Sequence, residues 1–232
     1  HRHRAEPDDD TEETTMSEFC QDRDLLGIEP GLFLGGGFAA QQLVGGSDGQ
    51  LSGTTFTSPG SDFSAAGVTA GMVLCVYDAS PDEGVPLEIL AVPSATTLTV
   101  SVLRAEADGP AVPPASAEGL SFRVRTFRPQ IRNASAALAE KLRQLAETAG
   151  VQSADFADSS QLCLTAAYLT LAGVFVAQAQ NAAAHDAHWI KAEHYRRESV
   201  RMQLQLRLAA DEDGDGFAER TRTLGHVTLR RS

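Results

Sequence analysis

The chain has 232 residues, 42% of them hydrophobic, and a formal net charge of −12 at pH 7. This apolar content is ordinary for a folded protein and excludes global disorder, and the length suffices for one large domain or two small ones. The negative charge argues against tight binding to nucleic acid or to an anionic membrane surface.

The first 48 residues are predicted to form two segments. Residues 1–21 are an acidic N-terminal tail with very few apolar side chains, a composition that does not support a packed core. Residues 22–48 are expected to contain a short helix that is broken at Pro30, followed by a glycine-rich connector.

Residues 49–130 are predicted to form a β-domain. The stretches "ATTLTVSVL" and "LSFRVRTF" alternate apolar with polar side chains, and "GTTFTS" is rich in β-branched and aromatic residues. Turn-like spacers such as "SPGSD" and "PSA" separate these runs. Five or so short strands at this spacing predict a small antiparallel barrel or sandwich, and no ligand pocket is recognisable in it.

Residues 131–210 are predicted to be helical. The stretch "SAALAEKLRQLAETAG" places leucines on one face and ends at Gly150, a residue type common at helix ends. A last helix is expected to begin near Asp186 and to continue through Leu208. The alternation of apolar residues from Val200 to Leu208 also fits a strand, but the run has no breaker and consists of good helix formers, so a helix is favoured.

Between these two helices, a helix from about Asp158 to Asn181 contains "LCLTAAYLTLAGVFVAQ", which is apolar almost all the way round. Such a helix is expected to be buried on all sides, either in the chain's own bundle or at a subunit interface. The stretch is just short of a membrane span and lacks basic flanks, so no membrane partner is expected. The residues expected at a subunit interface are Ala166, Ala172, Gly173 and Val176.

Residues 211–232 are predicted to form an acidic turn followed by a C-terminal strand. The turn matches the opening half of a calcium-binding loop, in which acidic residues alternate before Gly216. The closing position, where a bidentate Glu is required, is Arg222. A plain helix stop is therefore favoured over a Ca²⁺ site. The candidate metal ligands are Asp211, Asp213, Asp215 and Glu219.

No enzyme is predicted, because the chain contains no phosphate-binding loop, no HExxH, no GxSxG and no CxxC motif. No catalytic or cofactor-binding residues are assigned. An unrecognised enzyme would need convergent titratable groups, and the sequence offers only scattered carboxylates. The cysteines Cys20, Cys75 and Cys163 are far apart and are expected to be free thiols.

Together, these segments predict an α+β fold: a helical bundle with long helices in the C-terminal half, into which a small antiparallel β-barrel or sandwich is inserted.

The order of several segments resembles the head–tail adaptor (connector) proteins of long-tailed bacteriophages and of phage-derived gene-transfer particles. The resemblance covers residues 22–232. The segments that carry it are "DLLGIEPGLFL", "AAGVTAGMVL", "SATTLTVSVLRA", "RPQIRNASAALAEKLRQLAE", "HWIKAEHYRRESVRMQLQLRL" and "DEDGDGFAERTRTLGHVTLRR". The pairing of "GVTAGMVL" with "SATTLTV" is common in phage structural proteins generally, so it indicates a virion protein more than one particular role.

The resemblance implies a non-catalytic virion protein, made in the bacterial cytoplasm and located at the head–tail junction. It implies a homo-oligomeric ring, a dodecamer, below the portal that joins the capsid to the tail and extends the DNA channel. The implied partners are further copies of the chain, the portal protein and tail-terminator or stopper proteins. DNA would pass through without specific binding. An acidic chain suits this role, because it neutralises few phosphates and its contact with DNA would release few counterions. The alternative is a calcium-dependent protein-interaction module without catalysis, based on the turn at Asp211.

Overall fold

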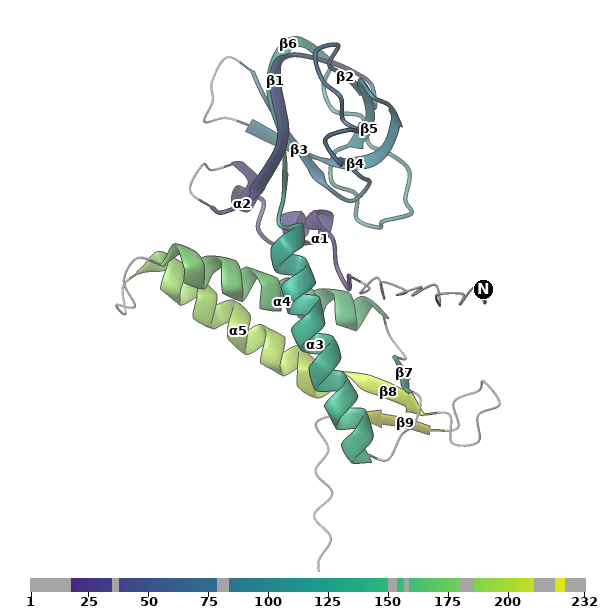
Figure 1. The fold of residues 1–232 in the computed structure, drawn as a ribbon, viewed down its shortest axis with the longest axis vertical. Helices are drawn as coiled ribbons and strands as arrows, with labels where there is room; N and C mark the ends of the chain where they lie inside the picture. Colours follow the sequence, from purple (N-terminus) through teal and green to yellow (C-terminus); the bar gives the residue numbers. More distant parts are fainter. Residues whose placement is uncertain are drawn as a thin grey trace, which may run out of the picture.

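The structure is a computed structural model that describes residues 18–34, 38–78, 84–149, 154–156, 159–179, 186–210 and 220–223. Within these ranges the chain forms five helices and nine strands. Figure 1 shows a β-barrel at one end of the molecule, a layer of helices beneath it and a small sheet at the far end of the helices.

The barrel is closed and has six antiparallel strands in the order β1-β2-β5-β4-β3-β6. The strands are β1 (Gln41–Ser52), β2 (Thr55–Thr57), β3 (Val73–Tyr77), β4 (Gly84–Ser94), β5 (Thr97–Ser101) and β6 (Ala117–Thr126). The first and last strands close it: Gln41 lies opposite Thr126, and Leu51 lies opposite Ala117. Closure leaves no free strand edge on this part of the fold.

Three phenylalanine rings occupy the centre of the barrel. The rings of Phe56 and Phe122 lie 5.0 Å apart, and Phe63 lies 6.2 and 6.1 Å from them. The rest of the interior is filled by the aliphatic side chains of Leu74, Leu87, Ile89, Leu98, Val100 and Val124. All of these side chains are buried, so the barrel encloses a packed core and not a ligand cavity.

Strand β1 begins inside the segment that was predicted to be a glycine-rich connector through residue 48. Its glycines let the strand run directly over the aromatic core. A Cβ atom at Gly46 would lie 2.7 Å from the ring of Phe122, and one at Gly49 would lie 2.8 Å from the ring of Phe56. The glycines are therefore needed for close packing and do not mark a flexible link.

Two short helices, α1 (Asp22–Ile28) and α2 (Gly31–Leu34), cover the outer face of β3. The predicted break at Pro30 lies between them. The side chains that pack together are Leu25, Leu26, Leu32 and Phe33 of the helices and Val73, Cys75 and Tyr77 of β3. Strand β3 is consequently buried on both faces, and the barrel is joined to the helical layer through a continuous apolar core.

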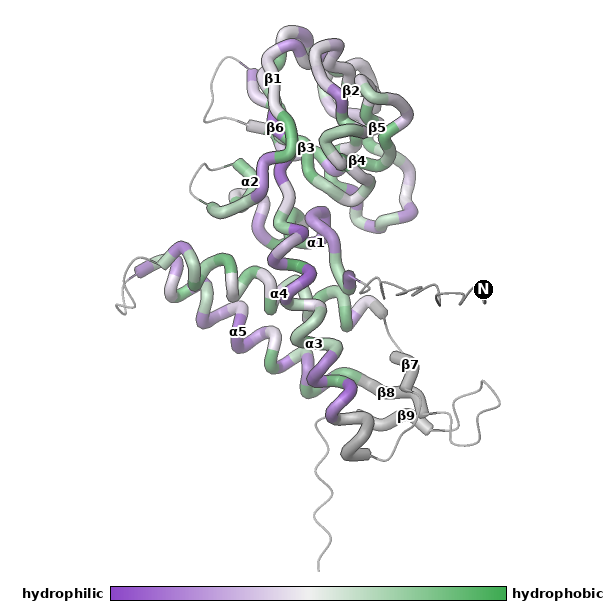
Figure 2. The backbone as a smooth tube through the Cα atoms, viewed as in Figure 1, coloured by the Kyte–Doolittle hydropathy of each residue, from purple (hydrophilic) through white to green (hydrophobic). Residues whose placement is uncertain are grey.

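The helical layer consists of α3 (Arg128–Ala149), α4 (Ser159–Gln178) and α5 (Ala187–Gln205). Helices α4 and α5 run antiparallel along their whole length, and α3 crosses them on its way from the barrel (Figure 1). Asp186 caps α5, because its side chain accepts hydrogen bonds from the backbone N–H groups of His188 and Trp189. Figure 2 shows that α4 is the more hydrophobic helix of the antiparallel pair.

A small antiparallel sheet contains β7 (Ala154–Phe156), β8 (Arg207–Ala210) and β9 (Arg220–Thr223), in that order. The prediction that the last helix continues through Leu208 is wrong, since α5 ends before Leu206 and the chain becomes a strand. Leu206 is buried with an extended backbone. The helix prediction thus holds for the alternating run as far as Gln205, and the strand pattern was the correct signal only from Arg207, where pairing of β8 with β7 outweighed helix propensity.

The predicted fold class is also wrong. The protein is a mixed α and β structure in which the closed barrel is the central element, not an insertion into a helical bundle. Only α4 and α5 pack along their lengths, and α3 crosses them (Figure 1). The all-round apolar character of α4 suggested burial in a bundle, but its cover comes from α5, α3 and α1, and part of its surface is exposed.

Candidate assembly interface

The structure divides the four predicted interface residues of α4 into two pairs. Ala166 and Ala172 are buried within the chain's own core, with exposed fractions of 0% and 6%. Gly173 and Val176 are exposed, and Val176 leaves 49% of its surface open. Only the second pair is therefore available to another molecule.

Gly173 is not required by the packing of the chain itself. A Cβ atom at this position would meet nothing within 4 Å, and the residue lies in regular helix. Glycine is unfavourable inside a helix compared with alanine. The surface around Gly173 is therefore open and could be approached closely by a neighbouring molecule.

Helix α5 carries a second exposed apolar surface, which the sequence did not predict. Ile190, Val200 and Leu204 leave 54%, 49% and 55% of their surfaces open. Together with Arg197 they follow spacings of seven, three and four residues, so the four side chains lie on one face. We call these four residues the α5 stripe. Monomeric proteins rarely leave such a row of apolar side chains uncovered.

Arg197 is the charged member of the α5 stripe. The neighbouring arginines are occupied by side chains of the same helix: Arg196 pairs with Glu193 at 3.2 Å and Arg201 with Glu198 at 2.6 Å. Among the residues that the structure describes, no acidic side chain pairs with Arg197. The stripe thus combines apolar contact area with one uncompensated positive charge.

The opposite face of α5 is held firmly against the rest of the fold. Glu29, at the end of α1, accepts hydrogen bonds from Lys191 and from the hydroxyl of Tyr195, both at 2.6 Å. Partial burial opposes ionisation of Glu29, but these two donors keep its pKa below the usual value. The Tyr195 ring also stacks on Phe175 at 5.6 Å. These contacts fix the rotation of α5, so that the stripe faces outward.

A groove with a volume of about 740 Å³ lies between the barrel and the start of α3. Its charged rim is already paired internally: Glu18 lies 2.7 Å from Arg128 and 3.8 Å from Arg132. Leu43 and Met72 supply apolar lining. The groove holds no nucleophile beside a general base, so it does not have the arrangement of a catalytic site.

The most perturbed carboxyl group near this region is Asp22 of α1. Burial raises its pKa to about 6, although hydrogen bonds from Thr126 and from the backbone of Phe127 act in the opposite direction. The side chain is only 2% exposed and does not line the large groove. We therefore assign Asp22 to the junction between α1 and α3 and not to catalysis.

The three cysteines are free thiols, as predicted. Burial raises the pKa of Cys75 to about 11 and that of Cys163 to about 12, and Asp24 adds to the shift at Cys163. Cys20 is shifted in the same direction for the same reason. Thiols of this kind are poor nucleophiles at neutral pH.

The candidate calcium ligands Asp211, Asp213, Asp215 and Glu219 lie outside the described residues. Within the part of the chain that the structure describes, no group of three or more His, Cys, Asp or Glu residues is arranged to hold a metal ion.

One helical segment in the described ranges, Ser160–Gln178, is long and apolar enough to cross a membrane, and half of it is buried inside the fold. The core helix of a protein outside membranes passes the same test.

Comparisons with protein-family models, with curated proteins and with solved structures found no match for this chain.

Proposed function

We propose that the protein is a non-catalytic structural subunit of a bacteriophage-type particle, a head–tail connector. In this role, copies of the chain assemble into a ring below the portal, join the capsid to the tail and extend the DNA channel. The order of the sequence segments that resemble connector proteins supports the proposal, and the surfaces of the helical layer supply its physical basis.

The observation that carries the proposal is the exposed apolar surface of a helix pair that is otherwise well packed. Val176, Ile190, Val200 and Leu204 are each about half exposed. Contact with a neighbouring subunit would remove this surface from water, which stabilises an assembly by roughly 25 cal/mol per Å² buried. Subunits of a closed ring contact each other through two different patches, and each patch is covered by one neighbour.

The charge of the chain also suits a channel. A net charge of −12 gives DNA little reason to bind, because few phosphates would be neutralised and few counterions released. The described residues offer no catalytic arrangement in the groove between the barrel and α3, and the barrel interior is filled by side chains. The groove without a catalytic arrangement and the filled barrel are both consistent with a structural protein that acts through its binding surfaces.

The proposal is tested by electron microscopy of the purified protein, alone and mixed with capsids that carry the portal. We expect rings in solution or a new collar at one capsid vertex. A protein that remains monomeric and also leaves the vertex bare would overturn the proposal.

Two matched variants make the test specific to the helical layer. Val176→Asp places a charge on α4, and Val85→Asp places one on β4 of the barrel, at positions that are 49% and 50% exposed. We expect Val176→Asp to prevent assembly and Val85→Asp to assemble like the wild type. Equal behaviour of the two variants would contradict an interface on this part of α4.

A further inference from the structure

The loop between β5 and β6 carries an exposed patch that is partly apolar, like the α5 stripe, but has the opposite charge. Val102 and Val112 leave 40% and 46% of their surfaces open. Glu106 and Asp108, between them in the sequence, are exposed, and within the described residues neither forms an ion pair. We call these four residues the acidic loop patch. It combines two exposed valines with two uncompensated negative charges.

The loop is held in shape by hydrogen bonds within it and by a contact with the barrel. The N–H of Val102 donates to the carbonyl of Val112 at 2.9 Å, which joins the two ends of the patch. Arg104 donates to the carbonyl of Gly109 at 2.7 Å and binds the buried carboxylate of Glu88 at 2.5 Å. A loop that is ordered before binding loses less conformational entropy when it docks.

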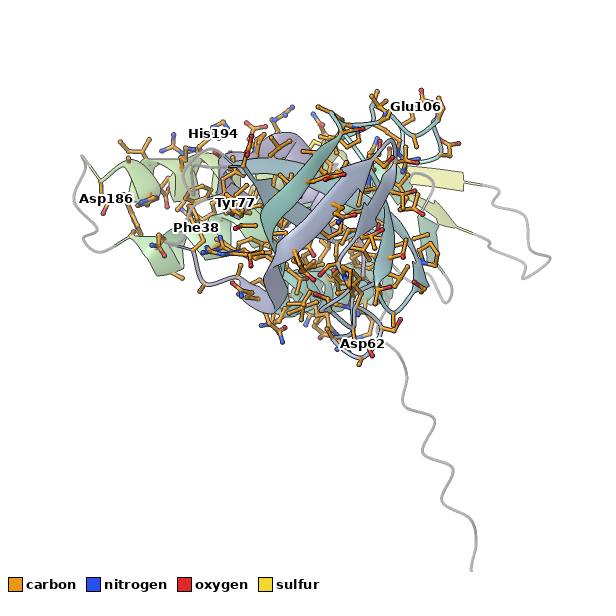
Figure 3. The ribbon with its side chains drawn as sticks, turned by 90° about the horizontal axis from the view of Figure 1, so that it is seen from above. Phe38, Asp62, Tyr77, Glu106, Asp186 and His194 are labelled. Atoms are coloured by element: carbon orange, nitrogen blue, oxygen red, sulfur yellow. The ribbon has the colours of Figure 1, made fainter. Side chains whose placement is uncertain are left out.

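The two patches lie on different parts of the molecule. The acidic loop patch belongs to the barrel and the α5 stripe to the helical layer (Figure 1). In Figure 3, Glu106 of the patch lies to the right and His194 of α5 to the left of centre, both toward the upper edge of the view. Both patches are exposed in the same chain, so neither is covered by the other within one copy.

We propose that the acidic loop patch of one copy docks on the α5 stripe of the next copy in the assembly. In this contact Val102 and Val112 cover the apolar members of the stripe, while Glu106 and Asp108 pair with Arg197. The inference rests on the proposed function, because it names one pair of surfaces through which the ring subunits meet. Since the surfaces differ, the contact is head-to-tail and repeats around a closed ring.

A symmetric dimer through the α5 stripe is a poorer arrangement. Arg197 lies seven residues from both Ile190 and Leu204, at the middle of the stripe. Antiparallel pairing of two stripes would therefore bring the two Arg197 side chains together, and like charges across an interface are unfavourable. The acidic loop patch supplies the opposite charge that this position needs.

The proposal is tested by exchanging the charges. The first variant is Arg197→Glu, the second is the double variant Glu106→Lys with Asp108→Lys, and Arg143→Glu on α3 is the control. Assembly is measured by analytical ultracentrifugation in solution and by collar formation on portal-bearing capsids. Circular dichroism checks that each variant is folded. We expect each of the first two variants alone to associate at least about tenfold more weakly than the wild type, and the control to be unchanged.

A mixture of the two weakened variants is the decisive sample. In alternating order, the introduced lysines of the second variant meet the introduced glutamate of the first, and the acidic loop patch of the first meets the unchanged Arg197 of the second. We expect the equimolar mixture to assemble when neither variant does so alone.

The outcomes separate the two proposals. The docking arrangement would be overturned if the wild type forms rings and the Arg197→Glu variant forms them equally well, or if the mixture fails to assemble. Either result would leave the connector role standing. A wild-type protein that forms no ring and no collar would overturn both.

Discussion

The carboxylate of Asp22 accepts a hydrogen bond of 2.7 Å from the backbone N–H of Phe127. This contact joins the first helix to the point where the chain leaves the barrel and enters α3, residues that are 105 positions apart in the sequence. It also places an ionisable group in a site with almost no access to water, since Asp22 is 2% exposed.

We expect this carboxyl group to make the stability of the protein depend on pH. Its pKa in the folded chain is about 6, against a reference value of 3.8. The folded state therefore holds the proton more tightly, and stability falls as pH rises from about 4 to about 6. The contribution of this group to the free energy of unfolding should decrease by about 3 kcal/mol across that window.

The variant Asp22→Asn keeps an oxygen acceptor for Phe127 and cannot ionise. Urea unfolding between pH 4 and pH 7.5 should show the variant gaining stability relative to the wild type as pH rises, whereas Asp108→Asn in the exposed loop should run parallel to the wild type. A constant difference between Asp22→Asn and the wild type would contradict the shifted pKa.

A second expectation concerns the buried carboxylate of Glu88, which binds Arg23 at 2.8 Å and Arg104 at 2.5 Å. Burial alone would favour the neutral acid, but the two guanidinium groups lower its pKa. Glu88→Gln would remove the counter-charge of Arg104 and leave Arg23 only its 3.4 Å contact with Asp24, and it should cost about 3–5 kcal/mol of unfolding free energy. Chemical denaturation measures this loss.

The matched control for Glu88 is Glu140→Gln on α3. Glu140 pairs with Arg143 on the solvent-exposed surface, where ion pairs contribute little. We expect almost no change in stability for this variant. Similar losses of stability for Glu88→Gln and Glu140→Gln would argue against a special role for the buried pair.

Because the pKa of Glu88 is lowered, its stabilising effect should be present above the pKa of an unfolded glutamate and be lost as pH falls through the folded value.

The strand pattern of the barrel could be predicted, but its limits could not. Leu98 and Val100 of β5 point into the core as their alternation indicates. Val102 continues the same alternation yet is 40% exposed, because the chain leaves the barrel there. The strand character of Gly46 and Gly49 was hidden, since their role is to admit the ring of Phe122 from β6, which is remote in the sequence, and the ring of Phe56 from the next strand. Such contacts leave no local pattern.

The candidate interface was only partly visible in the sequence for a similar reason. Helix α4 is apolar on every side, so periodicity cannot distinguish Ala172, which is buried, from Val176, which is exposed. In α5, Val200 and Leu204 are exposed, while Met202 is buried. Apolar residues on two faces of one helix were the available signal for a second contact surface. The acidic loop patch gave none, because its shape depends on the long-range bond between Glu88 and Arg104.

A third expectation concerns the hydroxyl of Tyr195, which donates to Glu29 at 2.6 Å. Burial and the adjacent carboxylate both raise the pKa of Tyr195, so the hydroxyl remains a donor at neutral pH. Tyr195→Phe should lower the free energy of unfolding by about 1–2 kcal/mol, because a partly buried acceptor loses one of its two donors. Thermal unfolding measures this loss, with Tyr168→Phe as the control. The rings of Tyr168 and Tyr195 stack at 6.0 Å, and the hydrogen bond to Glu29 comes from Tyr195. Equal destabilisation by the two variants would indicate that ring packing alone matters.

The last expectation separates folding from assembly at Gly173. Because a Cβ atom there meets nothing within 4 Å, Gly173→Ala should stabilise the isolated chain by about 0.5–1 kcal/mol through helix propensity. Gly173→Glu should also fold, yet it would place an unpaired carboxylate in a subunit contact and prevent ring or collar formation. Unfolding curves and electron microscopy of both variants test the two halves independently. Loss of folding in Gly173→Glu would mean that this surface is covered within the chain, and normal rings would place the subunit contact elsewhere on the helical layer.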